Sequence, residues 1–149
     1  MYEIYIEFLK KYNLYDKEVF DFIKDKTVYV DYMNTDSEDF IGVYPIVDED
    51  NIVRDLRMCV PTIVDDISIS MNIHEYVHLI KMYSNLNKEY VEDKYKELLP
   101  VMYELLFLKS INFNDYIDIY IEHIKKEDNY LKVLLDVFNL NSGNNITKK

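Results

Sequence analysis

Residues 52–84 read IVRDLRMCVPTIVDDISISMNIHEYVHLIKMYS, and they contain the change of pattern that decides the fold. From 52 to 60, apolar and polar residues alternate enough to indicate a strand, which ends at Pro61. From about residue 67 the apolar residues recur with the 3.6-residue period of a helix, and either member of the preceding aspartate pair can cap its start. The stretch therefore predicts a strand followed by a capped helix at 67–84.

The flanking sequence supplies further helices and two more strands. Residues 27–32 and 40–47 are rich in β-branched and aromatic side chains, and the second of these segments contains Gly42 and Pro45, as a short or edge strand would. Helical periodicity predicts helices at 2–11, at 16–25 after the capping Asp16, at 90–109 with an interruption or restart near Pro100, at 114–126 and at 129–139.

These elements predict an α+β fold. We expect a mainly helical single domain over residues 1–140, with a small antiparallel sheet packed beside the helix at 67–84. Residues 141–149 are polar and are expected to form a flexible tail. A chain of 149 residues, about half of them apolar, is long enough to form one real core.

Charge and composition exclude several classes of partner. The net charge is −11, and a field of this sign opposes binding to nucleic acid or to an anionic membrane. No apolar run approaches the roughly 20 residues of a membrane span. A single cysteine, Cys59, cannot form an internal disulfide, and we interpret it as a packing residue in the predicted strand. With acidic residues where a signal peptide would be basic, we expect a cytoplasmic protein, and its oligomeric state stays open.

The motif His74-Glu75-Tyr76-Val77-His78 carries the chemistry. Two histidines four residues apart on a helix place their rings on one face, where both imidazoles can bind one Zn²⁺ ion. Glu75 can then act as the general base on a water molecule at the metal, which is the H-E-x-x-H arrangement of zinc peptidases. The motif uses two of the three histidines, and the third, His123, is interpreted as a surface or satisfied helix residue.

A structural interpretation of the same helix competes with this one. Ile73, Val77 and Ile80 form an apolar stripe that would serve as core in either case. The adjacent face holds Met71 and Met82 beside the two histidines, and an amphipathic helix could carry such a pair incidentally.

A catalytic zinc needs a third protein ligand, and the following helix offers carboxylates. Glu97 and Glu104 are seven residues apart, hence on one helical face, and both interrupt an otherwise apolar segment. Because a buried carboxylate needs a partner or a metal, two on one face suggest a metal ligand and a residue that orients a metal-binding histidine. Three other acidic residues lie nearer the turn: Glu89, Glu92 and Asp93.

Together, the H-E-x-x-H motif and the pair Glu97 and Glu104 resemble the motif region of the thimet oligopeptidase and oligoendopeptidase F group and of its thermostable carboxypeptidase relatives. The resemblance covers about residues 70–108, and it implies a minimal zincin-like domain. In that group the first glutamate is the third zinc ligand and the second supports the first histidine, which implies these roles for Glu97 and Glu104. Val77 stands where the group usually has glycine, and the spacing to the third ligand is shorter. If the chain turns differently after Tyr83, Glu104 is the ligand instead.

We therefore expect a zinc-dependent metallopeptidase that hydrolyses a peptide or protein substrate. A regulatory zincin that cleaves one protein target remains open, as does a metal-binding or degenerate peptidase-like protein that acts as a non-enzymatic interaction module. Residues 55–64 are the candidate edge strand for pairing with substrate. The tyrosines available to stabilise an oxyanion are Tyr76, Tyr83 and Tyr103.

Overall fold

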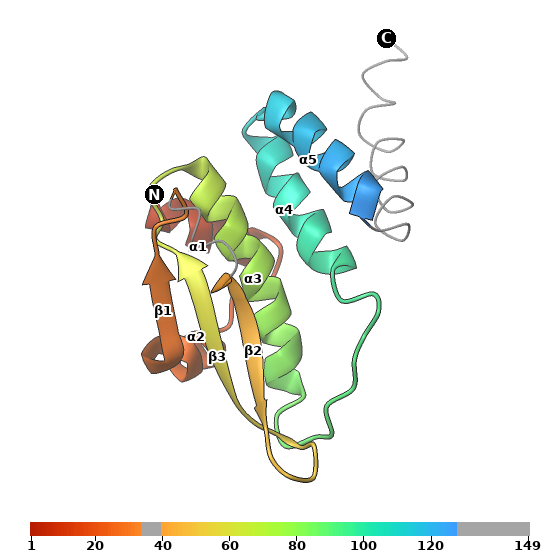
Figure 1. Ribbon diagram of the computed structural model, residues 1–149. Coiled ribbons are helices and arrows are strands. Elements are labelled where there is room, and N and C mark those ends of the chain that lie inside the picture. Colours follow the sequence, from red (N-terminus) through yellow and green to blue (C-terminus); the bar gives the residue numbers. More distant parts are fainter. Residues whose placement is uncertain (34–39, 128–149) are drawn as a thin grey trace. The chain divides into compact units, whose positions relative to one another are not determined.

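The computed structural model describes residues 1–33 and 40–127. The chain forms two compact units, Met1–Asp93 and Lys94–Lys149. The first contains the sheet and helices α1 to α3, and the second contains α4 and α5 (Figure 1). The predicted α+β class is confirmed, whereas the single domain over 1–140 stays a prediction. The helix expected at 129–139 and the tail at 141–149 lie outside the described residues.

Two short helices open the first unit close to their predicted positions. They are α1 (Tyr2–Lys11) and α2 (Lys17–Ile23). Asp16 caps α2 as expected, because its carboxylate accepts a hydrogen bond from the Glu18 amide at 2.9 Å. A single 3₁₀ turn, η1 (Lys24–Lys26), then leads into the first strand.

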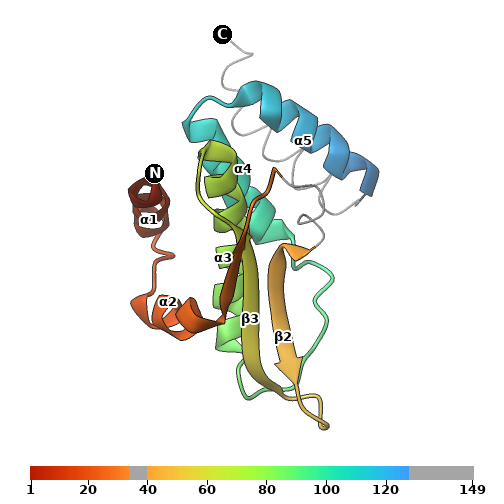
Figure 2. The same cartoon turned by 60° about the vertical axis from the view of Figure 1, so that its left-hand side comes forward.

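Three strands form one mixed sheet in the order β1-β3-β2. Their bounds are β1 (Thr27–Val30), β2 (Gly42–Val47) and β3 (Val53–Pro61). β2 and β3 form an antiparallel hairpin, whereas β1 pairs with β3 in parallel on the side away from β2 (Figure 2). The prediction of an antiparallel sheet is therefore wrong for β1. Side-chain alternation is the same in both kinds of pairing, so the pattern does not encode strand direction.

β3 is the central strand, and this corrects the predicted substrate strand. Met58 and Cys59 pair with β1 on one side and with β2 on the other, residues 55–57 pair with β2, and residues 60–61 pair with β1. An extended peptide therefore cannot add along the whole of this stretch, because neighbouring strands occupy part of each edge. β2 pairs only with β3 among the described strands, and it is an edge strand, as Gly42 and Pro45 predicted.

The motif helix is α3 (Asp66–Ser84), and its start is fixed by a capping box. The Asp65 carboxylate accepts from the Ser68 amide at 2.8 Å, and the Asp65 amide donates to the Ser68 hydroxyl at 3.0 Å. The Tyr32 hydroxyl also donates to the Asp65 carboxylate. These bonds satisfy donors that every helix start leaves unpaired, so α3 begins where the aspartate pair predicted.

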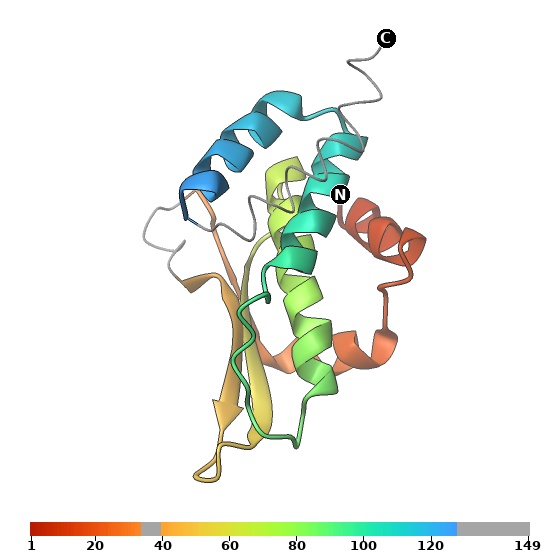
Figure 3. The same cartoon turned by 90° about the vertical axis from the view of Figure 1, so that its right-hand side faces the viewer.

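Helices α1, α2 and α3 lie on one side of the sheet, with α3 along β3 and β2 (Figure 3). The core of this unit fills the space between them with fully buried aliphatic side chains: Leu9, Leu56, Ile69, Ile73 and Leu79. Each fully buried side chain of this size contributes on the order of 1.5–3 kcal/mol relative to its exposed state. The sheet thus holds the motif helix rigidly from one side.

The chain after α3 returns to the sheet. The Asn87 amide donates to the Val53 carbonyl at 2.7 Å, and the Val53 amide donates to the Lys88 carbonyl at 2.9 Å. The Tyr90 amide donates to the Asn51 carbonyl at 2.8 Å. Because these backbone groups pair with the start of β3, residue 90 does not begin the helix that periodicity predicted there.

The second unit holds two described helices, α4 (Leu98–Ser110) and α5 (Asn114–Glu127). The predicted start of α4 at residue 90 is wrong, and Pro100 lies in its first turn, where the missing amide hydrogen is tolerated. α4 and α5 contact one another, and Ile117 and Ile121 are buried on one face of α5. α5 matches its predicted range.

Candidate metal centre

The two motif histidines lie one above the other on α3. Their ring centroids are 5.1 Å apart, and at least one ring nitrogen of each lies within 4.8 Å of the other's. A tetrahedral zinc with bonds of about 2.0–2.1 Å needs two nitrogens roughly 3.3 Å apart. Small rotations of two half-buried side chains can reach this distance. His74 and His78 therefore fit two positions of one zinc site.

Burial along α3 confirms two residues of the predicted apolar stripe, whereas the third, Ile80, is only half-buried. Ile73 and Val77 are buried, whereas both histidines and the flanking Met71 and Met82 are only half-buried. The histidines thus stand beside the core stripe and not within it. An ion-binding pair needs this placement, because a ligand ring must be accessible to the metal and its water.

Glu75 is half-buried on α3, the helix that packs along β3 and β2. Burial and the negative charge of Glu75 raise the pKa of the Cys59 thiol on β3. Burial, Cys59 and Glu75 together raise the pKa of Tyr44 on β2. The carboxylate therefore acts on both strands of the hairpin. Cys59 itself is a buried free thiol, as its packing role predicted.

Tyr44 is a candidate residue of the functional site that the sequence analysis did not identify. It lies on the edge strand β2, is 43% exposed, and donates a hydrogen bond from its hydroxyl to the Phe40 carbonyl at 2.5 Å. Only the pairing of β2 with β3 brings it near Glu75. With fifteen tyrosines in the chain, no local pattern distinguishes this one.

The acidic residues nearest the turn after α3 have other partners. Glu89 forms a backbone bridge with Ile52, and Asp93 pairs with Lys81 at 3.4 Å. The Glu92 carboxylate accepts a hydrogen bond from the Tyr90 hydroxyl at 2.6 Å. No group of three potential metal ligands within the described part of the chain includes Glu89, Glu92 or Asp93.

The two predicted carboxylates belong to the second unit. Glu97 is the N-cap of α4 and is half-buried, while Glu104 lies two turns further on and is only 3% exposed. The Tyr120 hydroxyl donates to the Glu104 carboxylate at 2.7 Å. Burial and the Glu104 charge raise the pKa of Tyr120 far above its usual value. Glu104 is thus a buried, hydrogen-bonded carboxylate and not part of a solvated helix face.

The three tyrosines proposed for oxyanion stabilisation differ in their burial and in their hydrogen-bond partners. Tyr76 is 1% exposed, accepts from the Asp16 amide and donates to the Leu14 carbonyl, both at 2.9 Å, so its hydroxyl is used in the core. The Tyr83 hydroxyl donates to Glu18 at 2.6 Å. Tyr103 is half-buried on α4. Tyr76 is therefore not an oxyanion donor.

The chain matches no protein-family model, no curated protein and no solved structure. Functional conclusions consequently depend on the residues and contacts described above. None of the helices in the described residues is long and apolar enough to cross a membrane. The remaining histidine, His123, is exposed on α5, as expected of a surface residue.

Proposed function

We propose that the protein is a zinc-dependent metallopeptidase that hydrolyses peptide bonds in a peptide or protein substrate. The observation that carries this proposal is the pairing of His74 and His78 on α3, with Glu75 between them in sequence and the β2–β3 hairpin packed along the same helix. Two accessible imidazoles with a carboxylate beside them, next to an edge strand, are the parts that this reaction needs. The single cysteine fits a reducing compartment, and we place the enzyme in the cytoplasm.

Glu97 is assigned as the third zinc ligand, and Glu104 as the residue that orients a metal-binding histidine. Zinc accepts two imidazole nitrogens and one carboxylate oxygen as ligands, with one position left open for water. The spacing of the two glutamates on one face of α4 supports the assignment. So does the burial of Glu104, because such carboxylates are held by hydrogen bonds.

Each residue then has a defined task. When bound, zinc supplies a Lewis acid that polarises the scissile carbonyl and lowers the pKa of a bound water to about 7. Glu75 takes the proton of the attacking water and delivers it to the leaving amine. The edge of β2 with which no described strand pairs binds the extended substrate through main-chain hydrogen bonds, the role that the sequence assigned to residues 55–64.

Metal content and cleavage of a peptide library test the proposal together. We expect about one zinc per chain by mass spectrometry, lost in His78→Ala and retained in His123→Ala, which removes the exposed histidine of α5. Glu75→Gln should keep the metal and lose about 10²–10⁴-fold in cleavage rate. Glu49→Gln, at an exposed turn, is the matched control.

Two outcomes would contradict the proposal. Full cleavage by Glu75→Gln would exclude Glu75 as the general base. Bound zinc with no cleavage by the wild-type protein would favour the alternative of a non-enzymatic metal-binding module. Cleavage of one protein but of no library peptide would instead indicate a regulatory zincin with a single target.

A further inference from the structure

The first unit contains a pocket of about 780 Å³ on the opposite face of α3 from the histidine pair. Asn72, Tyr76 and Leu79 line it, and on a helix these positions lie on one face. His74 and His78 are displaced by roughly half a turn from that face, so the two sites are separate. Pockets that hold small organic molecules span about 300–1,000 Å³. The size of this one therefore fits a small molecule.

One wall of the pocket is a row of aromatic rings. Phe20 stacks on Tyr76 with centroids 5.0 Å apart, and Tyr15 stacks on Phe20 at 5.3 Å. Tyr76 and Leu79, which both line the pocket, are almost fully buried. Since the rings of this row already stack on one another, a bound planar ring would meet their edges, in the edge-to-face arrangement that aromatic pairs also favour.

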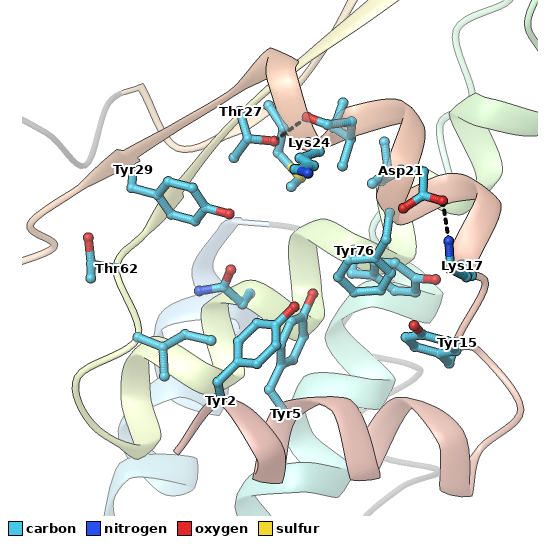
Figure 4. A pocket seen from close by; sticks show the side chains of 16 residues that line it. Tyr2, Tyr5, Tyr15, Lys17, Asp21, Lys24, Thr27, Tyr29, Thr62 and Tyr76 are labelled. Carbon is cyan, nitrogen blue, oxygen red and sulfur yellow. Dashed lines mark hydrogen bonds and ion pairs between the residues drawn. The ribbon is translucent and has the colours of Figure 1, made fainter.

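Three further tyrosine hydroxyls point toward the same space. Tyr2 and Tyr5 reach it from α1 and Tyr29 from β1 (Figure 4). Burial, with the neighbouring phenols, raises the pKa of Tyr2 and of Tyr5, so both stay protonated and can donate hydrogen bonds. Tyr5 is only 4% exposed, and its hydroxyl has no hydrogen-bond partner among the described residues. Every fully enclosed side-chain N or O atom among the described residues has a hydrogen-bond partner. The Tyr5 hydroxyl has no such partner, so it is not fully enclosed, and it opens into the pocket that Tyr5 lines.

Asn72 adds an acceptor. Its amide group donates to the Pro61 carbonyl at 2.8 Å and to the Ser68 carbonyl at 2.9 Å. These two bonds fix the orientation of the amide and leave its oxygen without a donor among the described residues. Asn72 is 5% exposed. Its oxygen has no such donor and is therefore not fully enclosed, so it opens into the pocket that Asn72 lines.

The charges in the pocket favour an anion. Lys17 is paired with Asp21 at 2.6 Å, whereas Lys24 forms no ion pair within the described part of the chain (Figure 4). The lining therefore carries one uncompensated positive charge. The protein has a net charge of −11, so a locally positive pocket differs in sign from the protein's overall electrostatic field.

We propose that this pocket binds a small aromatic carboxylate that also carries a hydrogen-bond donor on its ring. The ring packs edge-to-face against the stacked pair Phe20 and Tyr76. The carboxylate accepts hydrogen bonds from the hydroxyls of Tyr2, Tyr5 and Tyr29, and its charge is balanced by Lys24. The ring donor binds the Asn72 oxygen.

Binding of 4-hydroxyphenylacetate, measured by calorimetry on the full chain, tests the proposal. Tyramine has the same ring and hydroxyl with a positive charge, and 4-ethylphenol has no charge. We expect the acid to bind at least about tenfold more tightly than either, because hydrogen bonds to a charged group are the stronger ones. Comparable binding of tyramine, or no binding of the acid at about 10 mM, would overturn the proposal.

Matched variants assign the contacts. Lys24→Met should weaken binding of the acid about tenfold without changing that of 4-ethylphenol, and the exposed Lys88→Met should change neither. Tyr5→Phe, which keeps the ring, should also weaken binding of the acid, with circular dichroism confirming its fold. Unchanged binding in Lys24→Met would exclude the proposed head-group position.

A carboxylate can also bind zinc, so the measurement is repeated on His78→Ala. Undiminished binding to that variant supports the pocket, whereas loss of binding would place the acid at the histidine pair. The test is independent of the proposed peptidase activity, because it requires neither bound metal nor cleavage.

Discussion

At the scale of single residues, the five consecutive residues His74 to His78 of α3 lie in three different environments. His74 and His78 are half-buried and one turn apart, Glu75 is half-buried beside His74, and Tyr76 is in the core. Each residue advances the helix by roughly 100°, so neighbours in sequence face different surroundings. Mutations in this short motif should therefore separate metal binding, proton transfer and stability.

The two glutamates of α4 differ in what their neutral variants should do. Glu97→Gln should weaken zinc binding more than about 100-fold if it is the direct ligand, and Glu104→Gln about 10–100-fold. The amide oxygen that Glu104→Gln introduces would still accept the hydrogen bond from Tyr120, so the fold should be retained. Zinc affinities measured against a competing chelator show which of the two variants loses more affinity. A larger loss in Glu104→Gln would make that residue the ligand.

At the scale of elements, the start of α3 depends on Asp65. Burial opposes its ionisation, but hydrogen bonds from Tyr32 and Ser68 hold its pKa below the usual value. Asp65→Ala should lower the free energy of unfolding by about 0.5–2 kcal/mol. Urea unfolding, with Asp66→Ala as the control, measures the difference.

The same lowered pKa gives the pH dependence of this effect. A carboxylate with a lowered folded pKa stabilises the fold above its unfolded pKa of about 3.9, and this stabilisation is lost as the pH falls through the folded pKa. The difference between wild type and Asp65→Ala should therefore be constant near neutral pH and shrink below about pH 4. A constant difference down to about pH 2 would contradict it.

Tyr76 joins α3 to the connection between α1 and α2. Tyr76→Phe removes a hydroxyl that pairs with the Asp16 amide and the Leu14 carbonyl, and it should lower the free energy of unfolding by about 1–3 kcal/mol. Zinc content should not change. The Tyr83 hydroxyl donates to Glu18 at the surface, so Tyr83→Phe should change the free energy of unfolding by no more than about 0.5 kcal/mol. Equal losses in the two variants would contradict a core role for Tyr76.

At the scale of the whole molecule, the division of the chain into two units has a consequence for zinc. Residues 1–93 contain the sheet, α3 and both histidines, whereas Glu97 lies in the second unit. Expressed alone, residues 1–93 should fold cooperatively but bind zinc more than about 100-fold more weakly than the full chain and cleave nothing. Circular dichroism and chelator competition check this. Equal zinc affinity would remove Glu97 from the site.

Much of the secondary structure was predictable because its signals are local. α1, α5 and the start of α3 follow from periodicity and from Asp65, which act within one or two turns. The helix expected from residue 90 failed for the opposite reason. Residues 87–90 pair with the start of β3, more than thirty positions earlier, and this pairing overrides local preference.

The sequence alone determined the candidate metal pair, since a spacing of four residues on a capped helix fixes the relation of His74 to His78. Tertiary structure decided which strand is the edge, because alternation does not encode pairing order or direction. It also placed Tyr76 in the core, through a bond to a residue 60 positions away. The pocket of the first unit likewise takes its lining from α1, α2, η1, β1, β3 and α3, and only the folded chain brings these segments together.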